Sequence, residues 1–490
     1  MQPFIHPQPV IGRNEERSVL ESCLQEQRSH FVAVYGRRRI GKSFLIEQTL
    51  GPHACFSLVG TYHAPVKRQL QSFQMAMDKW KLTSQERFTN WLAAFHALSL
   101  ALERLAGLQK LVLLLDEVPW LDAKGSGFLE ALAHFWNDWA ARRNDVLLVI
   151  TGSASWWILR KVVASRGGLY GRVTRQLHLQ PFTLAETQDF LQSRGSPMTQ
   201  DDVLRLYMAL GGVPGYLDKV DRGWTAAEAI DHLCFSATGA MRREFEETIR
   251  SLFDHPDRHL AIIRCLAGGR YQGGWTRDEI CQETGIPSGG ALARTLEELE
   301  QSGFIAGRAP LGKAKNSRIF RLTDEYSAFY LYWVESGRAI PGTRDWLGMQ
   351  NTASYNAWAG RAFETVCLRH VAQIKRALGI DGLPSKELPW QVRADATTRG
   401  AQVDLLIENA FGYFLCEMKF PALNSSTGTY QVTPQMARDF LEKVSVFRLR
   451  AKLGKRKTLV QVFITPQGLY DSSHAREIAH RQVVGKQLFQ

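Results

Sequence analysis

The chain carries a glycine-bounded loop whose residue types suit the binding of a nucleoside triphosphate. Residues 36–43 read GRRRIGKS, a complete G-x-x-x-x-G-K-S motif, between a short apolar run and an expected helix. Gly36 and Gly41 allow backbone conformations that aim successive N–H groups at one anion. Lys42 is expected to reach the β- and γ-phosphates, and the Ser43 hydroxyl to help hold Mg²⁺. The loop therefore predicts ATP and Mg²⁺ as ligands.

Two carboxylates end a second apolar run. Residues 111–117 read LVLLLDE, which is typical of a central parallel strand that is buried on both faces. Ligands of parallel α/β sheets bind at the carboxyl ends of the strands. We therefore expect Asp116 to hold Mg²⁺ through water and Glu117 to orient or deprotonate the attacking water.

Polar residues also follow a third apolar run, at 146–153 (VLLVITGS). Ser153 or Thr151 is expected near the γ-phosphate; capping of the strand end is the alternative. Arg172 has two interpretations, a surface arginine or a group that stabilises transition-state charge in the same or a neighbouring subunit of a homo-oligomer. The residues expected to contact the nucleotide are Gly36, Arg39, Ile40, Gly41, Lys42, Ser43, Phe44 and Ser153.

A second group of chemically capable residues lies in the last third of the chain. Asp404 lies in an alternating run, and Glu417 and Lys419 end the run that follows, so a hairpin would bring the three together. Carboxylates are hard ligands for Mg²⁺ or Mn²⁺, and Lys419 would position or activate water. Glu364, from a preceding helix, would complete the metal site or its surroundings. The alternative is a solvated hairpin with a surface ion pair.

Composition limits the class of protein. The chain has 490 residues, of which 45% are apolar and 22% charged, as expected of a globular protein with several domains. We see no long apolar run and no secretion signal, so we expect no membrane span. The 7 scattered cysteines favour reduced thiols and a cytoplasmic location. A net charge of +12 favours a polyanionic partner such as DNA, with general solubility as an equal alternative.

The region between the two groups is expected to be mainly helical. Thr183 and Glu186 form a capping box that opens a helix, and GGVPGY at 211–216 breaks one. Residues 258–324 predict three helices followed by a basic hairpin, the pattern of a winged helix that contacts DNA. The third helix is acidic, with Glu297, Glu298 and Glu300, which favours a domain-coupling or dimerisation role instead. Both interpretations stand.

The order of these parts resembles a known family. The segments YGRRRIGKS, LLLDEVPWL, TGS, LYGR, GGVPGYL and, downstream, GRAFE, VDLL and EMK are similar to archaeal-type ATPases of the MNS clade of STAND/AAA+ P-loop NTPases that carry a C-terminal DUF234-like PD-(D/E)xK nuclease domain. The resemblance implies an α/β fold with five regions. These are a P-loop ATPase core at 1–180, a helical lid at 181–255, a winged helix-turn-helix at 256–334, an irregular linker at 335–355 and an α/β restriction-endonuclease-like domain at 356–490.

The resemblance also implies a function. An ATP-binding and ATP-hydrolysing core would be coupled to a metal-dependent DNA nuclease, with the nucleotide state gating DNA binding or cleavage. Glu117, Arg172 and Lys419 would be catalytic, and Ser43, Asp116, Glu364, Asp404 and Glu417 would serve the metal ions. The second hypothesis is a nucleotide-switched regulator or scaffold that binds DNA or protein and has a non-cleaving nuclease fold.

Overall fold

The chain folds into two compact units, residues 1–180 and 181–490, in the computed structural model. The structure describes residues 8–82, 87–105, 107, 109–268, 274–311, 317–338, 346–350, 352–392, 400–421, 428–451 and 457–490. Within these residues, no helix is both long and apolar enough to cross a membrane.

The N-terminal unit is built on a five-stranded parallel sheet in the order β2-β3-β4-β1-β5. The strands are β1 (His30–Tyr35), β2 (Ala54–Val59), β3 (Leu111–Asp116), β4 (Val146–Gly152) and β5 (Arg175–His178). Every residue of β1 and β4 is buried, as the apolar runs predict for central strands. The predicted α/β fold with a parallel sheet is confirmed. Because β4 lies between β1 and β3, the polar residues that follow these three strands meet at one edge of the sheet.

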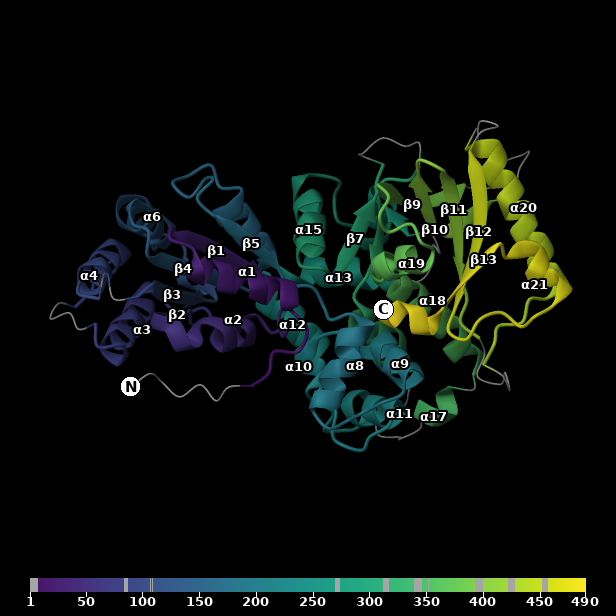
Figure 1. The fold of residues 1–490 in the computed structure, drawn as a ribbon, viewed down its shortest axis with the longest axis horizontal. Helices are drawn as coiled ribbons and strands as arrows, with labels where there is room; N and C mark the ends of the chain where they lie inside the picture. Colours follow the sequence, from purple (N-terminus) through teal and green to yellow (C-terminus); the bar gives the residue numbers. More distant parts are fainter. Residues whose placement is uncertain are drawn as a thin grey trace. The chain divides into compact units, whose positions relative to one another are not determined.

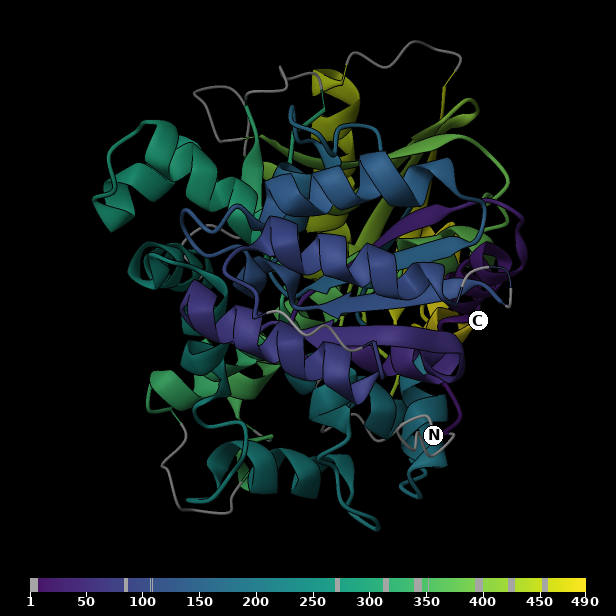
Figure 2. The same cartoon turned by 90° about the vertical axis from the view of Figure 1, so that its left-hand side faces the viewer.

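Helices cover this sheet. Its helical elements are α1 (Asn14–Gln25), α2 (Lys42–Leu50), η1 (Gly51–His53), α3 (Val66–Lys79), α4 (Trp91–Glu103), α5 (Val118–Leu121), α6 (Phe128–His134), η2 (Phe135–Trp139), η3 (Ala140–Arg142), α7 (Ser155–Trp157) and η4 (Ile158–Val163). Helices α3, α4 and α6 lie on one side of the strands (Figures 1 and 2). Between them, the Trp91 ring packs against Phe73 at 5.8 Å and Phe128 at 4.9 Å. Burying each such ring contributes roughly 1.5–3 kcal/mol.

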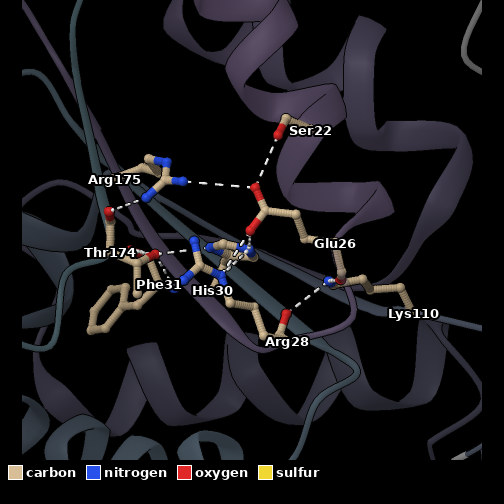
Figure 3. Close-up of polar contacts among 8 residues, drawn as sticks. All are labelled: Ser22, Glu26, Arg28, His30, Phe31, Lys110, Thr174 and Arg175. Carbon is tan, nitrogen blue, oxygen red and sulfur yellow. Dashed lines mark hydrogen bonds and ion pairs between the residues drawn. The ribbon is translucent and has the colours of Figure 1, made fainter.

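The amino end of β1 is fixed by a polar cluster (Figure 3). His30, the first residue of β1, is fully buried, and its ring nitrogens contact the Thr174 hydroxyl at 3.2 Å and the Glu26 carboxylate at 3.1 Å. Lys110 donates a hydrogen bond to the Arg28 carbonyl at 2.8 Å. The cluster joins the segments around β1, β3 and β5 at the edge of the sheet opposite the glycine-bounded loop.

The second unit begins with helices. They are α8 (Leu184–Ser193), α9 (Gln200–Leu210), α10 (Pro214–Leu217), α11 (Ala226–Ile230), η5 (Asp231–Phe235) and α12 (Glu244–Leu252). The predicted capping box of Thr183 and Glu186 is present at the start of α8. The GGVPGY segment is the turn between α9 and α10. There Phe182 donates its N–H to the Gly212 carbonyl at 2.7 Å, and the Tyr207 hydroxyl donates to the Phe182 carbonyl at 2.7 Å.

Three helices and a small antiparallel sheet follow. They are α13 (Pro256–Ala267), β6 (Trp275–Thr276), α14 (Arg277–Thr284), α15 (Gly290–Gln301), β7 (Ile305–Arg308) and β8 (Ile319–Leu322), with strand order β6-β8-β7. Two of the three acidic side chains of α15 named above are paired with basic residues. Glu298 is buried against His259 at 3.0 Å and Arg294 at 2.7 Å, and Glu300 pairs with Arg318. Lys313 and Lys315 of the expected basic hairpin lie outside the described residues.

One short helix lies within the expected irregular linker, 335–355. Helices α16 (Glu325–Phe329) and η6 (Tyr330–Glu335) lead into the linker, and α17 (Trp346–Met349) lies inside it. Trp346 is buried, and its ring lies 5.3 Å from Trp333 and 5.7 Å from Trp358. The segment expected to be irregular is therefore helical at 346–349, where the tryptophans of three separate elements form one apolar cluster.

The chain ends in a five-stranded mixed sheet in the order β13-β12-β11-β10-β9. Its elements are α18 (Ala353–Arg369), α19 (Val371–Ala377), β9 (Ser385–Val392), β10 (Ala401–Asn409), β11 (Gly412–Met418), α20 (Pro434–Arg450), β12 (Thr458–Thr465), α21 (Ser473–Ile478), β13 (Arg481–Val484) and η7 (Gly485–Phe489). Strands β9, β10 and β11 pair antiparallel, whereas β11, β12 and β13 pair parallel. Helices α18 and α19 lie on one side of the sheet and α20 on the other (Figure 1). The Phe440 and Phe447 rings of α20 pack on Phe463 and Trp390 at 4.8 and 4.9 Å.

Candidate functional site

The glycine-bounded loop runs directly from β1 into α2. Gly41 is the N-cap of α2 and has a left-handed φ of 90°, and Arg39 has φ 65°. Gly36 has φ 155°, and a Cβ atom there would lie 2.5 Å from the Leu179 carbonyl oxygen. The loop is therefore restricted to glycine at Gly36 by close packing and favours it at Gly41 by backbone conformation. The free N–H groups at the start of α2 favour an anion at this position.

Lys42 lies inside this loop. Its side chain is buried, and Nζ donates to the carbonyls of Gly36 at 3.0 Å and Arg37 at 3.1 Å and to the Ser153 hydroxyl at 3.0 Å. Burial lowers the pKa of Lys42, against the opposing charges of Glu117 and Asp116. A cation thus lies beside the backbone that is arranged for phosphate.

Ser43 and Asp116 form a pair of hard oxygen donors. The Ser43 hydroxyl donates to Asp116 Oδ2 at 2.6 Å. The other carboxylate oxygen accepts from the Thr151 hydroxyl and from the Glu117 N–H, the latter at 2.9 Å. Hydroxyl and carboxylate oxygens are ligands that Mg²⁺ takes, either directly or through water, so the donor set fits this ion.

Glu117 has an unusual backbone. Its φ of 50° and ψ of 48° are left-handed, a conformation that costs a non-glycine residue about 1–3 kcal/mol and often occurs at functional sites. Its carboxylate accepts from the Ser153 N–H at 2.9 Å and from the Ser153 hydroxyl. Ser153 therefore contacts Lys42 and Glu117 at once. The structure brings together Lys42, Ser43, Asp116, Glu117 and Ser153 as neighbours.

The other residues predicted to serve the nucleotide site differ in how deeply they are buried. Ile40 is buried, and Arg39 and Phe44 are half-buried within the loop and the first turn of α2. Arg172 is exposed and lies in a turn, where its backbone N–H donates to the Leu169 carbonyl at 3.1 Å. Arg13 is buried and donates to the Ile40 carbonyl at 3.4 Å and the Gln180 carbonyl at 2.6 Å, and so links the start of α1 to the loop.

Asp404 lies at an irregular point of β10. The pairing of β10 with β9 shifts by one residue between Val403 and Leu406, as in a β-bulge. On the other side, Leu405 pairs antiparallel with Cys416, so the preceding residue, Asp404, lies opposite Glu417. Asp404 Oδ2 accepts a hydrogen bond from the Met418 N–H at 2.9 Å. The hairpin predicted from the sequence thus brings the two carboxylates side by side.

Glu417 is held by two lysines. It is buried, and Lys419 donates to Oε1 at 2.7 Å. Lys443, from α20, contacts both oxygens, at 2.8 and 2.7 Å. Burial acts to raise the pKa of Glu417, but the two lysines hold it below its ordinary value. Burial, followed by the negative charges of Glu417 and Glu364, raises the pKa of Asp404 to about 7.

Glu364 is engaged elsewhere. Arg321, from β8, donates to its Oε1 at 2.6 Å, and each side chain is 21% exposed. Asp404 and Glu417 supply two carboxylates suited to Mg²⁺ or Mn²⁺, and their mutual repulsion is the kind that a cation relieves. Across the described ranges, however, no three histidine, cysteine, aspartate or glutamate residues are grouped to hold a metal ion. Glu364 is therefore not brought into a common set with the other two.

Two basic residues at this site were not predicted. Lys443 and Arg321 come from elements far from the hairpin in sequence, so no spacing relates them to Asp404 or Glu417. In the sequence, Arg321 belongs to the expected basic hairpin and Lys443 to a basic segment at 438–457. They can be identified only from their contacts in the folded structure.

The fold and the loop geometry define the N-terminal part as a P-loop NTPase. Residues 11–220 match the model of an ATPase domain found predominantly in Archaea, and the chain accordingly contains a nucleotide-binding ATPase domain. This match confirms the ATPase part of the resemblance. The expected C-terminal nuclease domain lies beyond the matched residues and stays a prediction. The chain is also 23% identical over 406 residues to the uncharacterized protein MJECL04 of Methanocaldococcus jannaschii, covering 81% of this chain and 84% of that relative.

Three solved structures are similar to part of the chain. The Walker-type ATPase PABY2304 of Pyrococcus abyssi has a TM-score of 0.46 and 19% identity, covering 66% of this chain and 96% of its own. The ORC2 protein of Aeropyrum pernix, in ADPNP–ADP complexes, has a TM-score of 0.41 and 16% identity, covering 66% and 93%. The RuvB Holliday junction branch migration motor of Thermotoga maritima has a TM-score of 0.35 and 18% identity, covering 63% and 92%.

Proposed function

We propose that the chain is an ATP-hydrolysing enzyme whose nucleotide state gates a DNA-directed, metal-dependent nuclease at its C-terminus. The observation that carries the ATPase part is the contact network of Lys42, Ser153 and Glu117 beside the Ser43–Asp116 pair. It places a cation, two hard oxygen donors and a carboxylate at the carboxyl edge of a parallel sheet, where such folds bind ligands.

Each residue of this network has a role in hydrolysis. Lys42 and the loop N–H groups bind the β- and γ-phosphates. Ser43 would hold Mg²⁺ directly and Asp116 would hold it through water, and the ion would neutralise phosphate charge. Glu117 orients or deprotonates the attacking water, and Ser153 keeps its carboxylate beside Lys42. Arg172 is proposed to reach the transferred phosphate from the same or a neighbouring subunit.

Two substitutions test the ATPase. Lys42→Ala is expected to weaken ATP binding, whereas Glu117→Gln is expected to retain binding and lower turnover by at least ~100-fold. Binding is measured by calorimetry and turnover by phosphate release. Glu130→Gln, an exposed carboxylate on α6, is the control and should change neither. Hydrolysis by Glu117→Gln at the control rate would exclude its proposed role.

The nuclease part rests on the arrangement of Asp404, Glu417 and Lys419 on the β10–β11 hairpin. This hairpin lies in a mixed sheet between α18 and α20, and we assign residues 356–490 to a restriction-endonuclease-like domain (Figure 1). Asp404 and Glu417 would hold Mg²⁺ or Mn²⁺, which supplies charge stabilisation when bound. Lys419 would position water and phosphate.

The regions before it are proposed to connect the two activities. We assign 1–180 to the ATPase core, 181–255 to a helical lid, 256–334 to a winged helix and 335–355 to a linker. The order of three helices and a hairpin over α13–β8 supports DNA contact. The pairing of Glu298 with His259 and of Glu300 with Arg318 removes part of the repulsion expected between α15 and phosphates. The net charge of +12 points the same way.

Cleavage assays test the nuclease. Plasmid and linear DNA are incubated with Mg²⁺ or Mn²⁺, with and without ATP. The wild type is expected to cleave the DNA, and Asp404→Ala and Lys419→Ala are each expected to abolish this cleavage. The matched control is Glu408→Ala on the same strand, which breaks the Lys457 ion pair and the hydrogen bond from Tyr413.

A second function is favoured by the pairing of Glu417 with Lys419 and Lys443. Such pairing would suit a nucleotide-switched regulator or scaffold that binds DNA or protein with a non-cleaving nuclease fold. This alternative predicts ATP-dependent DNA binding without cleavage under either metal. Cleavage that Asp404→Ala removes would exclude it.

A further inference from the structure

Glu364 forms its ion pair with a residue from outside the C-terminal sheet. Arg321 lies on β8, in the middle region of the chain, and Glu364 lies on α18. Their N–O distance is 2.6 Å, and both side chains are about four-fifths covered. A charge-assisted bond of this kind is stronger than an exposed ion pair, and a carboxylate engaged in it is a poor metal ligand.

Glu364 nevertheless lies close enough to act on the site. Its charge is among those that shift the pKa of Asp404. The surroundings of the site thus include a third carboxylate, which is bonded to a guanidinium. Glu364 would have to leave Arg321 to supply a third oxygen donor.

The segment that carries Arg321 is tied to α18 at a second point. Arg369, also on α18, donates to the Thr323 carbonyl at 2.8 Å and pairs with Glu325 at 2.6 Å. Glu325 in turn lies against the turn between α9 and α10, where a Cβ on Gly211 would come within 2.8 Å of its carboxylate. One short segment, 321–325, therefore contacts both the α9–α10 turn and the helix that bears Glu364.

We propose that Arg321 is an autoinhibitory latch, which holds Glu364 and keeps the Asp404–Glu417 site from binding a divalent cation fully until segment 321–325 shifts against α18. This inference rests on the proposed nuclease function and names the regulation of its site. The α9–α10 turn belongs to the proposed lid, so it is the element through which nucleotide state would release the latch.

Metal binding tests the latch directly. Mn²⁺ binding to the full-length protein without nucleotide is measured by calorimetry, and the binding that Asp404→Ala removes is assigned to this site. Arg321→Gln is expected to tighten that binding at least ~10-fold, because Glu364 is freed and a positive charge is removed. Arg318→Gln is the matched control, since Arg318 precedes β8 and pairs with Glu300 instead. It should leave Mn²⁺ binding unchanged.

A second pair of variants separates release of Glu364 from loss of charge alone. Arg321→Gln combined with Glu364→Gln should bind Mn²⁺ no more tightly than wild type, because the freed ligand is gone. If the double variant keeps the full gain, the latch is wrong and the effect is electrostatic only. Arg321→Lys keeps the charge but loses the two-pronged guanidinium geometry, and it replaces Arg321→Gln if that variant folds poorly. Its Mn²⁺ affinity should lie between those of wild type and Arg321→Gln.

The outcomes distinguish the two proposals. If wild type binds Mn²⁺ as tightly as Arg321→Gln and also cleaves DNA, the latch is wrong and the nuclease function stands. If no variant binds Mn²⁺ at this site and none cleaves DNA, the nuclease function itself is wrong and the latch falls with it.

Discussion

At the scale of single residues, the nucleotide site depends on which side chains share a partner. Ser153 donates to Glu117 and accepts from Lys42, so one hydroxyl fixes a cation and a carboxylate at the same edge of the sheet. The left-handed backbone of Glu117 is maintained by this contact, together with the Thr151 hydroxyl that accepts from its N–H at 3.2 Å. The strain is local, and the packed strands β3 and β4 compensate for it.

A buried histidine gives a pH dependence at this scale. His370 is fully buried; its Nε2 accepts from the Leu184 N–H at 2.9 Å and its Nδ1 donates to the Val366 carbonyl at 2.8 Å. Burial lowers its pKa to about 4. Between this value and the ordinary pKa of about 6.5, the unfolded chain binds a proton that the folded chain does not. The free energy of unfolding should therefore fall by up to roughly 3 kcal/mol as the pH decreases through this window.

The measurement is thermal melting at about pH 7 and about pH 5. His370→Gln should be less stable than wild type at the higher pH and should lose less stability on acidification. The exposed His255, changed to Gln, is the control and should keep the acid sensitivity of the wild type. Equal acid sensitivity of wild type and His370→Gln would contradict the assignment.

At the scale of elements, the α9–α10 turn is defined by close backbone approach. A Cβ atom on Gly212 would lie 2.1 Å from the Phe182 carbonyl oxygen and 2.8 Å from the Tyr207 ring. Gly211, the C-cap of α9, has a positive φ of 67°. The glycines of GGVPGY are therefore required by the packing of α9 against the segment that leads into α8.

Gly212→Ala is expected to lower the free energy of unfolding by roughly 1–3 kcal/mol, because the Phe182 segment must move away. Gly360→Ala is the matched control: Gly360 lies within α18, and an added Cβ meets no atom within 4 Å. This control should be neutral or stabilising by up to about 1 kcal/mol, since alanine favours helix. Thermal melting of both variants measures the difference in stability. A Gly212→Ala protein as stable as Gly360→Ala would show that the turn tolerates a side chain.

At the scale of the whole molecule, the two candidate sites lie in different compact units. The Lys42 site is contained in residues 1–180, and the Asp404 site in residues 181–490. A nucleotide that binds the folded first unit stabilises it by mass action, by about 2.7 kcal/mol at a hundredfold excess over Kd. Any effect on the second unit requires coupling between the units.

Hydrogen exchange with and without ATP and Mg²⁺ measures both effects. Peptides covering 36–50, 111–117 and 146–153 should gain protection. If nucleotide state gates the C-terminal site, peptides covering 319–325 and 360–370 should change as well. Lys42→Ala should abolish both responses. Protection confined to the first unit would separate ATP binding from the C-terminal site.

The sequence by itself determined the local features. The G-x-x-x-x-G-K-S spacing, the apolar runs that end in Asp116 and Ser153, and the capping box of Thr183 and Glu186 all depend on residues close together in the chain. Their physical causes are backbone freedom, strand burial and helix capping, which act over a few residues. For this reason, the parallel α/β fold and the ATPase domain could be predicted.

Only the tertiary structure decided which distant side chains meet. Arg321 on Glu364 and Lys443 on Glu417 join elements that no spacing relates, and the two pairings determine which carboxylates are available. The inward turn of Glu298 likewise depends on His259 from another helix. Long-range pairing of charges follows from how helices and strands pack, because packing sets which groups lose water together. The carboxylates of the C-terminal candidate site could therefore be identified from the sequence, whereas their ion-pair partners depend on the packed fold.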